Sequence, residues 1–182
     1  MHSITDIFNL ILKSIFVGFG FIMPILALIR TSNLKALEVK DLFILTAVQA
    51  VRVSGIVYFI LAAKDAYFVY SDGVSYEHTN VSAGAYWFYV FFSPLMYLVI
   101  TQCFWIKKLY MKKPALITLS LLLLVLPSSF FMLFLKADTY MPLIKLMFSV
   151  GNLSAFLLNI IVFIFITFTI ILLGGKLKDK KA

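Results

Sequence analysis

The sequence predicts an all-α integral membrane protein, a five-helix transmembrane bundle that forms a single domain over residues 1–182. Three observations predict this class. The chain is 63% hydrophobic and only 13% charged, whereas soluble domains are roughly 45–50% apolar and about 25% charged. Five apolar runs reach the length of about 20 residues that a helix needs to cross a hydrocarbon core. Basic residues also gather in alternate connections between these runs.

Each apolar run is predicted to form one helix, because a helix satisfies its own backbone polar groups in lipid. The alternating pattern of a membrane barrel is absent. The predicted helices cover about residues 7–29, 42–63, 85–106, 115–135 and 143–173. The last run is longer than a crossing requires, so we expect that helix to tilt or to project at one end.

The first run is predicted to be a retained helix and not a secretory signal. Asp6 is the only charge before Lys13, so the basic region that opens a signal peptide is missing. The run is also longer than the apolar region of a signal, and no A-x-A cleavage pattern follows it. We therefore count it as the first membrane crossing.

The longest predicted connection between two helices, residues 64–84, follows the second helix. It carries Asp72-Gly73 between aromatic and β-branched residues that begin at Ala66. An Asp-Gly pair suits a type I′ turn, because both central residues of that turn need positive φ. We predict a small β-hairpin at the outer surface, which acts either as a capping loop or as a recognition element or lid over the bundle.

The orientation is predicted from the distribution of basic residues. Five crossings place three basic groups on one side of the membrane, as in the positive-inside rule. These groups are Arg30, Lys35 and Lys40; Lys107, Lys108, Lys112 and Lys113; and Lys176, Lys178, Lys180 and Lys181. We therefore expect the N-terminus outside and the C-terminus in the cytoplasm.

The net charge of +8 is explained by this topology, and no folded soluble face is predicted that could bind nucleic acid. Neither a metal nor a cofactor is expected. The single cysteine, Cys103, lies in an apolar run, and the two histidines, His2 and His78, lie in the N-terminal tail and a loop. Haem ligation by paired histidines inside the bundle is therefore excluded.

Arg52 is the most informative residue of the sequence. It lies near the middle of the second apolar run, where insertion scales put the cost of an arginine at about 2.5–3.5 kcal/mol. No Asp or Glu is predicted at comparable depth in the other helices. Gln49, Thr46 and Gly55 recur with Arg52 at helical spacing. This stripe is predicted to face protein or water and not lipid.

Three kinds of partner for Arg52 stay open at the level of sequence. Backbone carbonyls freed at Pro24, Pro94 or Pro127 could accept its hydrogen bonds. An anionic ligand, such as a lipid phosphate or a small anion, is the second possibility. A carboxylate of a partner protein is the third, because an unpaired charge in a membrane helix favours assembly.

The other candidate ligand- or partner-binding residues surround Arg52 in the predicted bundle. Lys13 is a second base inside an apolar run, and it can be neutralised by Asp6 or extend towards the outer interface. The third and fifth helices contribute polar side chains that could face the same interior. The full candidate set is Arg52, Gln49, Lys13, Tyr97, Gln102, Asn152 and Asn159.

An enzymatic role is not predicted. The eight acidic residues fall at segment ends, in loops or in the tail, so a buried carboxylate for cation transport is not expected. The sequence contains no G-x-S-x-G and no H-E-x-x-H motif. Small-xxx-small patterns such as Ser14–Gly18 let helix backbones approach closely, within one bundle or between subunits.

The leading hypothesis is a non-catalytic, multi-pass subunit or accessory protein of a larger membrane assembly. Its expected partners are the lipid bilayer and either other membrane subunits or further copies of itself. We expect it in a bacterial inner membrane or a plasma membrane. The alternative is a small oligomeric channel or carrier for an anion or amphipathic molecule that uses Arg52. A membrane enzyme acting on lipid is a third reading, which lacks a recognised catalytic group.

Overall fold

A computed structural model describes the backbone of residues 4–30, 32–71, 83–135 and 150–174. Within these ranges, side chains are not described at residues 4–6, 68–71, 83–91, 93, 125–135 and 150–152. The described part is all helical. Its helices are α1 (Ile4–Leu28), α2 (Leu34–Ser71), α3 (Ala83–Cys103), α4 (Lys107–Met111), α5 (Lys113–Leu135) and α7 (Val150–Leu173).

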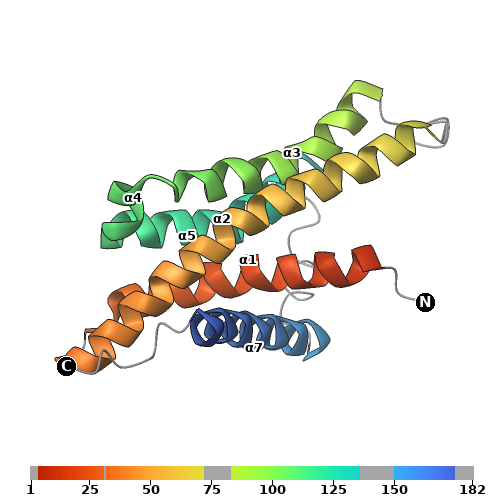
Figure 1. The fold of residues 1–182 in the computed structure, drawn as a ribbon. Helices are drawn as coiled ribbons and strands as arrows, with labels where there is room; N and C mark the ends of the chain where they lie inside the picture. Colours follow the sequence, from red (N-terminus) through yellow and green to blue (C-terminus); the bar gives the residue numbers. More distant parts are fainter. Residues whose placement is uncertain (1–3, 31, 72–82, 136–149, 175–182) are drawn as a thin grey trace.

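Helix α1 is the centre of the bundle, because it packs against α7, α5 and α2. Figure 1 shows α7 on one side of α1 and the pair α3 and α5 on the other, with α2 crossing obliquely. Phe19 of α1 is fully buried. Its ring meets Phe104 at 5.1 Å and Phe163 at 6.3 Å between centroids, both edge to face. Aromatic side chains from three parts of the chain thus build one core.

Ser14 and Gly18 form the face of α1 that approaches α7 most closely. Ser14 Oγ donates to Asn159 Oδ1 of α7 at 2.8 Å. One turn on, a Cβ added to Gly18 would overlap the Cβ of Phe163. Lipid offers little hydrophobic drive for helix association, so close backbone approach and interhelical hydrogen bonds have to supply it. The small-xxx-small pattern is therefore used inside the bundle.

Three helices of the described part are long and apolar enough to cross a membrane, over Ile7–Leu28, Leu34–Tyr67 and Leu153–Leu173. The sequence predicted five crossings. Two further apolar stretches are helical but shorter within the described residues, at Pro94–Cys103 and Lys113–Leu124. The structure thus supports three membrane-spanning helices and not the full predicted number.

The second predicted helix is longer than expected, and part of the predicted hairpin is wrong. Helix α2 runs from Leu34 to Ser71, whereas the sequence predicted residues 42–63. Residues 66–71, expected as the first strand of the hairpin, continue the helix. No Gly or Pro occurs between Gly55 and Gly73, so nothing in the sequence interrupts propagation of the backbone hydrogen bonds. The rest of the predicted hairpin lies outside the described residues.

Helix α4 is the other departure from the sequence prediction, which ended the third helix at residue 106 and left a loop after it. The structure ends α3 at Cys103 and places the short α4 over Lys107–Met111. Helix α7 begins at Val150, and residues 143–149 of the fifth predicted helix lie outside the described part.

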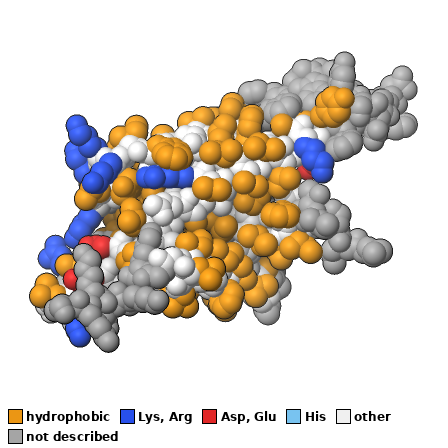
Figure 2. All heavy atoms as spheres, viewed as in Figure 1, with side chains coloured by type: hydrophobic (Ala, Val, Ile, Leu, Met, Phe, Trp, Pro, Cys, Tyr) orange, Lys and Arg blue, Asp and Glu red, His pale blue; other side chains and the backbone are white. Residues whose placement is uncertain are grey.

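Lysine side chains gather at the end of the molecule where α4 lies, while hydrophobic side chains cover most of the surface between the two ends (Figure 2). We call this the basic end. One pocket is lined by Lys40 at the start of α2 and by Lys107 and Lys113, so these three lysines lie at the same end of the molecule. The basic end comprises Lys35, Lys40, Lys107, Lys108, Lys112 and Lys113.

We predict that Gly18→Val destabilises the protein, because the new side chain would overlap Phe163 where α1 meets α7. Overpacking typically costs about 1–3 kcal/mol. Thermal unfolding of the purified protein in detergent micelles should therefore move to lower temperature. Ala155→Val is the matched control, since Ala155 is an exposed position of α7. Equal unfolding temperatures for the two variants would contradict this packing.

Candidate functional site

The candidate site lies where the middle of α2 meets the turn that follows α3. Helix α3 ends at Cys103, and three short-range hydrogen bonds shape the turn. Phe104 N donates to Thr101 O at 3.3 Å, Trp105 N to Gln102 O at 3.0 Å and Ile106 N to Cys103 O at 3.2 Å. Bonds over three residues tighten the last turn of a helix and use carbonyls that the helix leaves unpaired.

The Arg52 guanidinium is held by this turn. Its Nη2 donates to the backbone carbonyl of Phe104. Its Cζ lies 5.0 Å from the centroid of the Trp105 ring and 5.1 Å from that of Tyr110. Each cation–π contact is worth roughly 0.5–1 kcal/mol when exposed and about 2 when desolvated. The C-terminal end of α3 also carries partial negative charge, which favours a cation there.

Gln102 ties the same turn to the backbone of α2. Its Nε2 lies 3.4 Å from the carbonyl oxygen of Arg52, and its Oε1 accepts a 2.7 Å hydrogen bond from Trp105 Nε1. The residues Arg52, Gln102, Phe104, Trp105 and Tyr110 thus form one connected group. We call this group the Arg52 clamp.

Close packing beside the clamp fixes how α2 lies against α3. Thr101 is buried, and its Oγ1 donates back to Tyr97 O at 2.7 Å. A Cβ added to Gly55 of α2 would overlap this Oγ1. Glycine is therefore required at position 55 for the two helices to approach as closely as they do. The contact lies one turn from Arg52 and sets the register of the clamp.

The guanidinium lies nearer to the basic end than the position of Arg52 in the sequence suggests. Trp105 is 59% exposed, and Lys107 and Lys108 begin α4 directly after it. Trp, Tyr and Lys side chains are typical of the membrane interface. A long cationic side chain can rise from a buried Cα to that level. The Cα of Arg52 thus lies near the middle of α2, while its guanidinium lies beside Trp105 and Tyr110, close to the basic end.

A backbone carbonyl is one of the three kinds of partner that the sequence left open for Arg52. The structure provides it, but from the turn that ends α3 and not from a proline. Arg52 Nε is buried and has no hydrogen-bond partner in the described part of the chain. The Phe104 carbonyl and the two aromatic rings therefore satisfy only part of the hydrogen-bonding capacity and charge of the guanidinium.

Among the other predicted site residues with described side chains, Gln102 lies beside Arg52 and the rest lie elsewhere. Gln49 and Lys13 are exposed. Tyr97 packs in an aromatic group, with its ring 4.5 Å from Phe16 and 5.3 Å from Tyr58. Only Gln102 contacts Arg52, through the backbone carbonyl described above.

Two asparagines of the predicted set lie on α7, apart from the clamp. Asn159 is buried and pairs with Ser14 of α1. Asn152 lies within α7, but its side chain is outside the described residues. Asn159 therefore stabilises the contact between α1 and α7 and is not part of the Arg52 clamp.

Sequence reasoning missed the aromatic half of the clamp. Trp105 and Tyr110 flank the lysines at the end of the third apolar run, and such residues mark a membrane interface. That pattern could have indicated where a cation would find π-faces. No sequence pattern could have identified the Phe104 carbonyl as the partner of Arg52, because every residue has a backbone carbonyl.

The described residues include no group of three or more His, Cys, Asp or Glu side chains that could hold a metal ion. No protein-family model matches the chain, and neither a curated protein nor a solved structure is similar to it.

We predict that Arg52→Gln and Arg52→Lys both lower the thermal unfolding temperature in detergent micelles. Glutamine loses the charge, and lysine lacks the planar face that stacks on aromatic rings. A buried group left without its hydrogen bond costs about 1–3 kcal/mol. Lys13→Gln is the control, since Lys13 is exposed, and its effect should stay within about 0.5 kcal/mol. An Arg52→Lys variant as stable as the wild type would contradict the clamp.

Proposed function

We propose that the chain is a non-catalytic, multi-pass integral-membrane subunit or accessory protein of a larger membrane assembly. We also propose five crossings, with the N-terminus outside and the C-terminus cytoplasmic, in a bacterial inner membrane or a plasma membrane. The lengths of α3 and α5 support this count. At 1.5 Å per residue, their 21 and 23 residues extend about 31 and 34 Å. The hydrocarbon core is about 30 Å thick.

Several hydroxyl groups of the described helices are engaged by their own backbone, which supports a non-catalytic role, although the buried Thr46 Oγ1 has no hydrogen-bond partner among the described residues. Ser120 Oγ donates to Leu116 O at 2.7 Å, and Thr167 Oγ1 donates to Phe163 O at 2.9 Å. Thr101 bonds the preceding turn of α3 in the same way. Such bonds satisfy a polar side chain inside an apolar helix. A nucleophilic hydroxyl would instead pair with a general base.

The length of α2 is the observation that carries the proposal of a subunit. Its 38 residues extend about 57 Å, nearly twice the hydrocarbon core. Even a strongly tilted α2 therefore projects from the membrane. Its start exposes two large apolar side chains, Leu34 at 76% and Leu37 at 38%. Apolar side chains on a projecting helix are suited to contact with another protein.

The Arg52 clamp supports the same reading. Arg52 does not line the pocket shared by Lys40, Lys107 and Lys113, and its contacts instead hold α2 against the turn between α3 and α4. A fixed turn presents the lysines of α4 and the start of α5 in one arrangement. Arg52 would then have a structural role, and the fixed turn would offer a partner a preformed basic surface.

A channel or carrier for an anion is the second candidate, and one observation favours it. Arg52 Nε is buried and has no hydrogen-bond partner in the described residues. A buried donor without a partner is costly, so a bound anion or water could complete the site. In this case the chain would act as an oligomer, because five helices are few for a monomeric carrier.

We predict that the full chain, extracted in mild detergent at native expression, carries a stoichiometric companion in native mass spectrometry. The companion is another membrane protein or a second copy of the chain. The double variant Leu34→Ser/Leu37→Ser should lose it, because these side chains lie exposed at the start of α2. Leu10→Ser is the matched control, since Leu10 is 57% exposed on α1, and it should retain the companion.

A solitary monomer for the wild-type chain would contradict the subunit proposal. So would chloride flux in liposomes that contain the chain alone, if Arg52→Gln abolished it while Lys13→Gln did not. That result would favour the carrier.

A further inference from the structure

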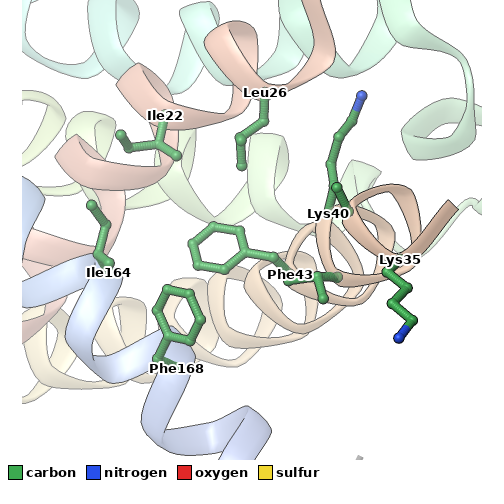
Figure 3. Close-up of a pocket in the computed structure, with 9 residues that line it drawn as sticks. Ile22, Leu26, Lys35, Lys40, Phe43, Ile164 and Phe168 are labelled. Atoms are coloured by element: carbon green, nitrogen blue, oxygen red, sulfur yellow. The ribbon is translucent and has the colours of Figure 1, made fainter. Parts of the chain in front are cut away.

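A pocket opens between α1, the start of α2 and α7, close to the basic end. Its volume of about 550 Å³ lies within the range of roughly 300–1,000 Å³ typical of small-ligand sites. Figure 3 shows the rings of Phe43 and Phe168 side by side at its floor, 5.5 Å apart between centroids. The remaining wall is aliphatic, from Ile22, Leu26 and Ile164.

Two lysines of α2 form the rim of this pocket. Lys35 and Lys40 lie on the same helix as Phe43, and in Figure 3 their ammonium groups point away from the apolar wall and in opposite directions. Lys40 Nζ donates to the carbonyl of Ile29 at 2.8 Å, which fixes its position at the end of α1. An ammonium has three donors, so the remaining two stay available to a ligand.

The rim is continuous with the other lysines of the basic end. Lys40 also lines a second pocket of about 550 Å³, whose charged lining residues are Lys40, Lys107, Lys113 and one acid, Asp41. An apolar cavity that opens onto several cations matches an amphipathic anion, with a hydrocarbon part inside and the charge outside. The arrangement combines apolar burial with the attraction of basic clusters for anionic lipids.

We infer that this pocket is a binding site for an anionic phospholipid. One acyl chain lies between Phe43, Phe168 and the aliphatic wall, and the headgroup phosphate lies on Lys35 and Lys40. The site is independent of the proposed function, because neither Leu34 nor Arg52 lines it.

Charge disfavours the two other occupants that the chain itself could offer. Residues 175–182 follow α7 in the sequence and carry four lysines against one acid, Asp179. A second copy inserted in the same orientation would have its own basic end at the same level as the first. Both occupants would bring positive charge near Lys35 and Lys40, which is repulsive. A phospholipid with a net negative headgroup complements the rim.

The test uses the purified full chain in a neutral detergent. Phosphatidylglycerol and phosphatidylcholine are added separately at equal concentration, and bound lipid is counted by native mass spectrometry. The expected result is several-fold more bound phosphatidylglycerol than phosphatidylcholine. Lys35→Gln/Lys40→Gln should remove this preference. Lys108→Gln/Lys112→Gln is the matched control, since both residues belong to the basic end but line neither pocket, and it should keep the preference.

A third variant tests the apolar part of the site without changing any charge. Ile164→Trp should fill the cavity beside Phe168 and lower phosphatidylglycerol binding several-fold, with the unfolding temperature in lipid-free detergent unchanged. Equal loss of lipid in the two lysine double variants would overturn the site and indicate general attraction to the basic end. Full competition by inorganic phosphate would overturn the role of the acyl chain.

Discussion

The Arg52 guanidinium lies against the end of α3, where the Phe104 carbonyl accepts its hydrogen bond and Trp105 and Tyr110 cover it. A cation in an apolar helix has to find such partners, because leaving it unpaired costs several kcal/mol. The contact determines how α2 meets the α3–α4 turn. That turn in turn positions α4 and the lysines of the basic end. The architecture of this end therefore depends on the contacts of Arg52, together with the packing of Gly55 against Thr101.

The described helices are also held together by close approach of their backbones. Gly18 against Phe163 and Gly55 against Thr101 leave no room for a side chain. The Ser14–Asn159 hydrogen bond joins α1 to α7 at the same face as Gly18. Membrane helices associate by such contacts, since lipid is as apolar as their own side chains. Arg52 thus orients the basic end, and the glycines allow the helices to pack closely.

The helical class and the position of α1 could be predicted from the sequence, because both follow from the apolar composition and the length of the apolar run. The extent of α2 could not be predicted in this way. Charged residues such as Lys64 and Asp65 mark the edge of an apolar run, but they are tolerated inside a helix that leaves the membrane. The Asp72-Gly73 pair predicts a hairpin turn, whereas residues 66–71 before it are helical. Arg52 could be singled out from sequence, but its carbonyl partner could not.

The most direct test of this account is a double-mutant cycle of Arg52→Gln and Trp105→Leu, followed by unfolding in detergent micelles without added lipid. If the two side chains stabilise each other through the clamp, their effects are coupled by about 0.5–2 kcal/mol. The pair Lys13→Gln and Trp105→Leu should be additive, because Lys13 lies exposed on α1. Additivity of Arg52 and Trp105 within about 0.3–0.5 kcal/mol would contradict the central claim that the chain supplies the guanidinium with its own partners.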